Sequence, residues 1–361
     1  MITPKRNIGY RIGYYLAFFS ILLALGTSPS MPLGAQNANP ASDFEYDLNE
    51  KGTGVLITKY KGDGKNVIIP STIEDFPVVE LKGAFAETNV ESVVIPDSVT
   101  YLTSDGYLSC FFGCKSLKKI TLPKGLEYID SYSFAYSGLE SIRVPDSVVY
   151  MGKLVFWNCK QLKTVTIGNG VEVIGSGAFK ACTSLTTLSI GSGVKQIADD
   201  AFSNCTALES ISIPDNVIYI GKEAFSSCEQ LKTVTIGNGV QVIDEYAFGG
   251  CTALTTVSIG SGIKCIRSKV FGDCTALTSF NIGVAYLGNT DTDNSPTFKI
   301  ESFDIELIKF TEHYSDKEVE VYRFLQGYAS DAFVGCTALS LKEKKKIRDS
   351  GYTGEFGSSK K

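Results

Sequence analysis

Histidine is nearly absent from this chain, and its scarcity excludes several kinds of active site. Only His313 occurs among 361 residues, so a histidine-rich metal site is excluded and any Ser-His-Asp triad would need that residue. No nucleophile elbow surrounds it, and no glycine-rich phosphate loop occurs in the chain. The carboxylates of Glu318 and Glu320 leave hydrolysis as the one catalytic alternative. We therefore expect a non-enzymatic protein without a cofactor or a metal.

Positive charge and long apolar runs are also scarce. The formal net charge is −5, so we expect no broad nucleic-acid-binding face. The one long apolar run, residues 14–26, follows basic residues and precedes small residues that end at Ala35. This order is typical of a secretory signal peptide, so we expect cleavage after Ala35 and export to the cell surface or beyond, with the periplasm as an alternative. The run is short for a membrane span, although an uncleaved anchor is the other interpretation.

A phenylalanine recurs along the chain at a near-constant spacing. Successive members of the series lie about 23 residues apart, which is within the range of known repeat architectures. The series is Phe111, Phe134, Phe156, Phe179, Phe202, Phe225, Phe248 and Phe271. A fixed period of this length indicates a solenoid, in which each turn buries its apolar face only against its neighbours.

One repeat, residues 205–227, shows how a turn is built. Ile211 and Ile213 alternate with serines, which predicts a strand with one face buried and one exposed. Residues 214–216 predict a tight backbone turn between two strands. The pattern from Val217 to Ile220 then predicts a short return strand. Because every connection runs in the same direction, the sheet must be parallel. A block of three repeats also recurs farther along the chain, since the segment from Cys159 returns from Cys228.

The repeat matches the string I-P-x-x-V-x-x-I-x-x-x-A-F-x-x-C, which resembles the BspA-like subfamily of bacterial leucine-rich repeat surface proteins. The matching residues are Ile213, Pro214, Val217, Ile220, Ala224, Phe225 and Cys228. The resemblance covers about residues 64–287 and again 328–341. It implies a mainly β leucine-rich repeat solenoid that contacts a protein ligand, such as a host extracellular-matrix or cell-surface protein, and mediates adhesion. A structural or envelope scaffold that binds a partner of the same cell is the alternative.

Cysteine follows most of these phenylalanines by three positions and forms a second column with them. The column residues on which this interpretation depends are Phe179, Phe202, Phe225, Phe248, Cys182, Cys205, Cys228 and Cys251. Side chains stacked in parallel are poorly placed for disulfides, so we interpret the cysteines as buried thiols. Cys110 is expected in the core. Cys265 replaces the Gln196 of the copied block, so we expect it to be exposed and the best candidate for a reactive thiol.

The repeats are bounded by segments of different character. Residues 36–63 alternate like a hairpin and would cap the first turn, and residues 288–327 form an acidic insertion with a predicted β hairpin. The last repeat and a C-terminal cap occupy residues 328–361. There we expect Leu339 and Leu341 in the final turn, a basic helix over residues 342–349, and Tyr352 and Phe356 folded back onto the stack.

Three candidate partner-binding regions emerge from the pattern. The outward positions of the main strand are small and hydroxyl-bearing: Thr164, Thr166, Thr187, Ser210, Thr233 and Thr256. Strand propensity and solubility explain such residues equally well, and binding hot spots favour tryptophan, tyrosine and arginine. The insertion offers stronger anchors in Phe303, Phe310, Tyr314 and Tyr322, as do Tyr101, Tyr107 and Trp157 in the first repeats.

Overall fold

The computed structural model describes residues 37–106, 108–283, 327–328, 331–350, 352 and 356. The chain divides into two units, Met1–Asn37 and Ala38–Lys361. Of the first unit only Asn37 is described, so the predicted signal peptide lies outside the described residues, as does Tyr107. The second unit contains the repeats.

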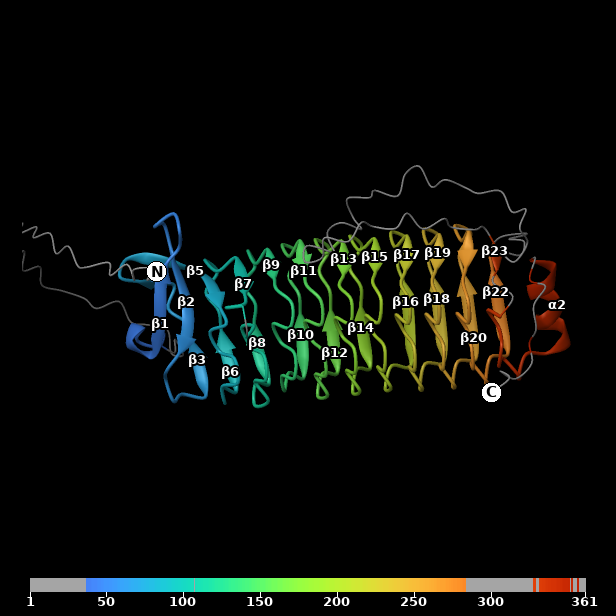
Figure 1. Cartoon of the computed structure of the whole chain (residues 1–361), viewed down its shortest axis with the longest axis horizontal. Helices are drawn as coiled ribbons and strands as arrows, with labels where there is room; N and C mark the ends of the chain where they lie inside the picture. Colours follow the sequence, from blue (N-terminus) through green and yellow to red (C-terminus); the bar gives the residue numbers. More distant parts are fainter. Residues whose placement is uncertain are drawn as a thin grey trace, which may run out of the picture. The chain divides into compact units, whose positions relative to one another are not determined.

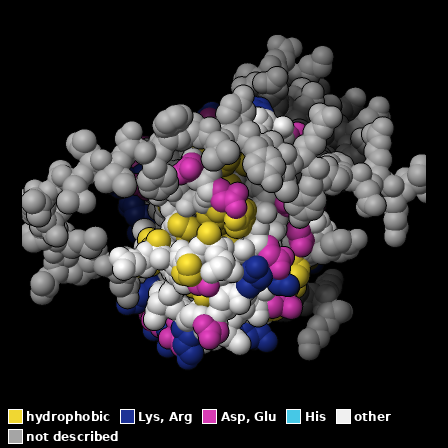
Figure 2. All heavy atoms as spheres, turned by 90° about the vertical axis from the view of Figure 1, so that its left-hand side faces the viewer, with side chains coloured by type: hydrophobic (Ala, Val, Ile, Leu, Met, Phe, Trp, Pro, Cys, Tyr) yellow, Lys and Arg dark blue, Asp and Glu magenta, His cyan; other side chains and the backbone are white. Residues whose placement is uncertain are grey.

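The second unit begins with a hairpin that confirms the predicted cap. A short 3-10 helix, η1 (Ala41–Asp43), leads into β1 (Phe44–Leu48), which pairs antiparallel with β2 (Val55–Tyr60). The strand β2 then pairs in parallel with β5 (Phe76–Lys82), which also pairs antiparallel with β4 (Thr72–Ile73). Figure 2 looks onto this end of the stack and shows hydrophobic side chains at the surface among acidic and basic ones.

Two ladders of parallel strands follow the hairpin (Figure 1). The first ladder consists of β3 (Asn66–Ile68), β6 (Ser92–Val94), β8 (Lys119–Thr121), β10 (Ser141–Arg143), β12 (Thr164–Thr166), β14 (Thr187–Ser189), β16 (Ser210–Ile213), β18 (Thr233–Ile236), β20 (Thr256–Ile259) and β22 (Ser279–Ile282). Its hydrogen bonding forms three sheets, β3-β6-β8, β10-β12-β14 and β16-β18-β20-β22. These strands are the main strands predicted from the repeat.

The second ladder is built from the short return strands. After β5 it contains β7 (Tyr101–Thr103), β9 (Tyr128–Ile129), β11 (Tyr150–Met151), β13 (Val173–Ile174), β15 (Gln196–Ile197), β17 (Tyr219–Ile220), β19 (Val242–Ile243), β21 (Cys265–Ile266) and β23 (Gly327–Tyr328). One sheet runs from β1 to β11 and another from β13 to β23. The predicted class, a mainly β solenoid of regular repeats with parallel sheets, is therefore confirmed.

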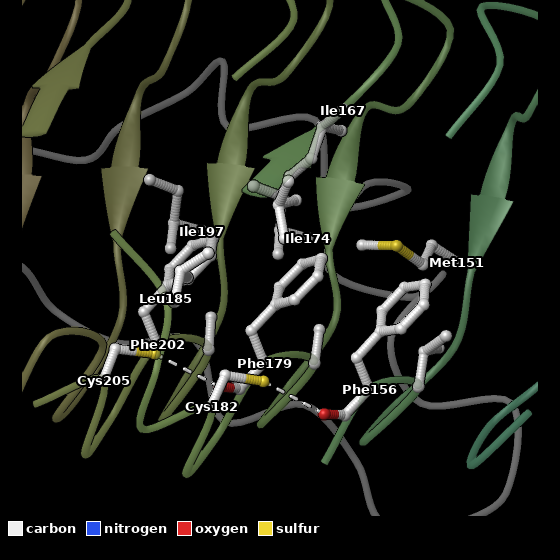
Figure 3. Packing of buried hydrophobic residues seen from close by; sticks show 14 of the residues in the cluster. Met151, Phe156, Ile167, Ile174, Phe179, Cys182, Leu185, Ile197, Phe202 and Cys205 are labelled. Carbon is white, nitrogen blue, oxygen red and sulfur yellow. Dashed lines mark hydrogen bonds between the residues drawn. The ribbon is translucent and has the colours of Figure 1, made fainter. Parts of the chain in front are cut away.

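The phenylalanines form a continuous stack between the two ladders (Figure 3). The ring centroids of Phe156 and Phe179 lie 5.0 Å apart, and those of Phe179 and Phe202 lie 5.2 Å apart with an interplanar angle of 1°. This spacing follows from the separation of adjacent strands, about 4.8 Å, and it lies in the range at which aromatic pairs attract each other. Each ring is fully buried, and the stack runs through a core completed by aliphatic side chains from every turn.

The stack extends beyond the series that the sequence period identified. Phe85 lies 5.2 Å from Phe111, and the ring of Tyr60, in β2, lies 5.2 Å from Phe85. Phe44 of the hairpin closes this end at 5.6 Å from Tyr60. The hairpin therefore seals the core with its own aromatic residues as well as covering the first strands.

The C-terminal cap closes the other end as predicted, with one correction. Tyr352 and Phe356 are buried against Phe333, at centroid distances of 5.0 and 6.0 Å. The helix α2 spans Leu341–Asp349, and the hydroxyl of Ser340 caps it by accepting a hydrogen bond from the Glu343 N–H. Placing Leu341 in the last turn was wrong, because it starts this helix and is 87% exposed.

The cysteines confirm their interpretation as buried thiols. All ten are free, and the eight that lie three residues after a stacked phenylalanine each donate a hydrogen bond to the phenylalanine carbonyl of the preceding turn. Figure 3 shows this bond from Cys182 to Phe156, at 3.2 Å, and from Cys205 to Phe179, at 3.3 Å. The thiols thus satisfy buried carbonyl groups where successive turns meet. Cys110 is likewise fully buried.

Candidate interaction surfaces

The first ladder aligns the predicted serines and threonines in one row. Thr164 pairs with Thr187 in the sheet that contains β12 and β14. In the next sheet, Ser210, Thr233 and Thr256 occupy one register position in β16, β18 and β20. We call this row, together with Thr166 in β12, the hydroxyl face. It comprises Thr164, Thr166, Thr187, Ser210, Thr233 and Thr256.

The hydroxyl face is exposed because its residues alternate with buried aliphatic ones. Val165, Ile211 and Val234 point inward and are at most 4% exposed, whereas Thr164 and Thr233 face outward. Each outward side chain can both donate and accept a hydrogen bond. Successive rows lie about 4.8 Å apart, so the face is regular and held in place by the stack beneath it.

The second ladder presents aromatic side chains near its N-terminal end. Tyr101, Tyr128 and Tyr150 occupy one register position in β7, β9 and β11. Their ring centroids are 6.3 Å apart for the first pair and 4.4 Å for the second. Tyr101, which the sequence singled out, is 43% exposed, so this row reaches the surface.

A polar cluster follows farther along the same ladder. The hydroxyl of Tyr219 donates a hydrogen bond of 2.5 Å to Asp244, and Arg267 lies 3.6 Å from the same carboxylate. Burial, followed by the charge of Asp244 and this hydrogen bond, raises the pKa of Tyr219. Burial also raises the pKa of Asp199, although its carboxylate accepts a hydrogen bond from the Lys222 N–H. Each of these side chains has a hydrogen-bond or ion-pair partner within the fold, so we interpret the cluster as structural.

The expectation that Cys265 is exposed is wrong. Cys265 is only 3% exposed, because β21 is an interior strand whose neighbours place Val242 on one side and Gly327 on the other. Burial raises the pKa of this thiol to about 11, with the charge of Arg267 opposing the shift. Comparison with Gln196 misled the prediction because Gln196 is itself partly buried in β15. Cys265 is no longer a candidate for a reactive thiol.

The described residues on either side of the insertion belong to one turn of the solenoid. The described chain stops at Gly283, after β22, and resumes at β23, which pairs with β21. Phe333 then stacks on Phe271 at 5.5 Å, as the repeat requires. Gly327, expected inside the insertion, therefore belongs to a strand of the solenoid. The predicted contact residues of the insertion lie outside the described residues: Phe303, Phe310, Tyr314 and Tyr322.

Within the described part of the chain, we find neither a metal centre nor a membrane-crossing helix. No three or more His, Cys, Asp and Glu side chains among those residues are grouped so that they could hold a metal ion. No helix in the same ranges combines the length and apolar character that a membrane crossing requires. His313 lies outside these ranges, as do Glu318 and Glu320.

The repeat geometry agrees with the comparison with known families. The BspA type leucine rich repeat region matches in six copies, over residues 81–209 and 195–315. The matches span more than half of the chain, which therefore belongs to the BspA-type leucine-rich repeat family. Among the curated proteins, none matches the chain.

Several solved structures are similar to this solenoid. The leucine-rich repeat protein of T. pallidum is 23% identical, with a TM-score of 0.39 over 90% of this chain and 100% of that one. A leucine-rich repeat protein of Bacteroides ovatus is 19% identical, with a TM-score of 0.45 over 82% of this chain and 80% of that one. The pneumococcal vaccine antigen PcpA is 19% identical, with a TM-score of 0.40 over 70% and 84% of the two chains.

Proposed function

We propose that this chain is an exported, non-enzymatic protein-interaction repeat protein that mediates adhesion of a bacterial cell to host proteins or to other cells. Membership of the BspA-type leucine-rich repeat family supports the interaction role. The observation that carries the proposal is the hydroxyl face. Its exposed hydroxyl groups, such as those of Thr164 and Thr233, repeat at a fixed spacing over a fully buried core.

The hydroxyl face suits a broad partner better than a small molecule. It is an outward sheet surface, and its hydroxyl groups offer many similar hydrogen bonds. A stable protein interface buries about 800 Å² on each partner, which a long, regular sheet face can supply. A core of stacked rings keeps the face rigid, so little conformational entropy is lost on binding.

The test is a binding screen of the chain against extracellular-matrix and serum proteins. The first variant combines Thr187→Lys and Thr233→Lys, which place charge in the middle of the hydroxyl face. Lysine is compatible with this row, because Lys119 occupies the equivalent position in β8. The matched control is Thr252→Lys, an exposed turn residue whose equivalent in an earlier turn is Lys160.

We expect a matrix or serum protein to bind the unaltered chain saturably. The same protein should bind the double variant about tenfold more weakly and the control variant with unchanged affinity. A variant in which a short turn replaces residues 284–326 separates the face from the insertion. If only this variant loses binding, recognition belongs to the insertion instead. If the unaltered chain binds nothing in the screen, the adhesion proposal fails and the scaffold of the same cell becomes the leading function.

A further inference from the structure

Four aromatic residues form a further exposed surface, distinct from the hydroxyl face and from the row of Tyr101, Tyr128 and Tyr150. They lie in the turns that follow return strands, in the repeats of Phe111, Phe134 and Phe156. The ring of Tyr136 lies 4.7 Å from that of Trp157 and 5.7 Å from that of Phe112, with interplanar angles of 66° and 73°. Tyr132 packs against Trp157 at 6.4 Å. We call these residues the aromatic ridge: Phe112, Tyr132, Tyr136 and Trp157.

The aromatic ridge is not part of the buried core. Phe112, Tyr136 and Trp157 are each partly exposed, and Tyr132 is 39% exposed. The stacked phenylalanines that follow or precede them in sequence are fully buried by contrast. The ridge therefore offers aromatic surface from three consecutive turns to a ligand outside the protein.

The fold does not require aromatic side chains at these positions. In later turns the position of Trp157 is held by Ser203 and Ser226, and that of Tyr136 by Asn158 and Asn204. Tyr132 and Tyr136 both have left-handed backbones, with φ of 61° and 60°. A bulky side chain is disfavoured there. Glycine takes these two positions in other turns, at Gly177 and Gly250. Tyr132 and Tyr136 keep bulky rings on left-handed backbone, and their gathering with Phe112 and Trp157 in one cluster points to a function.

Positive charge borders the aromatic ridge. Lys115, Lys153 and Lys160 are exposed, and none of them forms an ion pair with another described residue. Lys153 is held beside the ridge, since its carbonyl accepts a hydrogen bond from the Tyr132 N–H at 3.0 Å. Glu87, close to Gly113, brings one carboxylate to the N-terminal side of the ridge. The lysines favour a ligand that carries negative charge.

We propose that the aromatic ridge binds an anionic polysaccharide. The apolar faces of sugar rings pack on aromatic rings, and carboxylate or sulfate groups pair with Lys115, Lys153 and Lys160. A polymer with regular units suits a ridge whose aromatic residues recur at successive turns along the solenoid. A protein partner fits less well, because a standard interface needs about 800 Å² on each side and the ridge is only a few side chains.

The experiment measures retention of the full chain on immobilised hyaluronan and chondroitin sulfate, with neutral dextran as the comparison. The variants Trp157→Ser and Tyr136→Asn each introduce the residue found at that position in other turns, which protects the fold. Lys115→Thr combined with Lys160→Thr removes charge in the same way, since Thr183 and Thr206 are the equivalents. Tyr246→Gly is the control, because Tyr246 aligns with Tyr132 but lies five turns away.

We expect binding to at least one of the two anionic polymers, weakened about tenfold by Trp157→Ser or Tyr136→Asn. The lysine double variant should weaken it similarly, and rising salt should do the same to the unaltered chain. Tyr246→Gly should bind as the unaltered chain does. Absence of binding to both polymers overturns the proposal, as does full binding by both aromatic variants. Equal retention on dextran overturns the assignment to an anionic ligand. Circular dichroism confirms that each variant is folded.

Discussion

The thiol of Cys336 donates a hydrogen bond of 3.1 Å to the carbonyl oxygen of Phe271, although 65 residues separate them. In the preceding turn the same bond joins Cys274 to Phe248 across 26 residues. The insertion accounts for the difference between these two separations, and the bond crosses it without a change in the local geometry. The turn after the insertion therefore contacts the turn before it in the same way as two turns that are consecutive in sequence.

The first prediction concerns removal of this insertion. Residues 284–326 are replaced by Ser-Gly-Ile-Lys, the segment that joins Gly260 to Cys265 in the previous turn. We expect the stack to remain intact, because the replaced segment spans only from the end of β22 to the start of β23. Thermal unfolding followed by circular dichroism should give a midpoint no lower than that of the unaltered chain. A clear fall would show that the insertion supports the last turns.

The second prediction concerns the reactivity of the thiols. Burial raises the pKa of Cys228 to about 12, and a backbone hydrogen bond offsets the shift only in part. At pH 8 only about one such thiol in ten thousand is ionised, and the thiolate is the reactive form. Ellman's reagent should therefore react only slowly with the folded chain, whereas all ten cysteines should react rapidly once guanidinium chloride has unfolded it. Rapid reaction of any thiol in the native protein would contradict its burial.

The third prediction concerns the phenylalanine stack. Replacing Phe202 with alanine removes a fully buried ring between two stacked neighbours and leaves a cavity. The free energy of unfolding should fall by about 3–5 kcal/mol, as measured by urea denaturation. The control is Leu341→Ala, because Leu341 is 87% exposed and its loss should change stability by no more than about 0.5 kcal/mol. Equal effects of the two changes would exclude the stack as the main source of stability.

The fourth prediction concerns the pH dependence that Asp199 contributes. Burial is the main cause that raises the pKa of this carboxyl in the folded state above its usual 3.8, and Asp244 and Asp200 add to it. Its contribution to stability is complete below pH 3.8 and is lost as the pH rises through the folded pKa. Asp199→Asn should therefore stabilise the protein at pH 7 but not at pH 3. The asparagine oxygen can still accept the Lys222 N–H, as the side chain of Asn169 does for Ser192.

The measurement for Asp199 is the unfolding midpoint of both proteins across this pH range. Lys180→Ala is a useful comparison, because it removes the partly exposed ion pair with Asp200 and leaves Asp199 in place. It should have a small effect at pH 7, as surface pairs generally do. A larger gain from Asp199→Asn at pH 3 than at pH 7 would reverse the expected sign and contradict the role of burial.

Most of the fold could be predicted from the sequence because each turn repeats the same physical problem. A phenylalanine that recurs at a fixed interval and alternating isoleucines define one core and one strand without reference to distant contacts. The prediction missed Phe85 and Tyr60, since the step from Phe85 to Phe111 is longer than the period and Tyr60 replaces phenylalanine. It also missed the burial of Cys265, which depends on a strand that resumes only after the insertion.

The candidate sites were less predictable than the fold. The row from Thr164 to Thr256 was identified, because alternation along a strand determines which side chains point outward. The clustering of Tyr132, Tyr136 and Trp157 was not, although Trp157 had been noticed, because the three occupy different positions within their repeats. Only the stacking of turns brings these positions together, and no period along the sequence reveals it.

The identical register of successive turns has a consequence for how this protein can change in length. Thr164 pairs with Thr187, and Ser210 pairs with Thr233, in the same alignment, so any turn presents equivalent edges to the next. A copied block of three turns, such as the one that begins at Cys159 and recurs at Cys228, can therefore be inserted in frame without compensating substitutions in the adjacent turns. Such an event displaces one end of the stack from the other by about 14 Å. The separation between the aromatic ridge and the C-terminal cap is thus a quantity that a single duplication can reset.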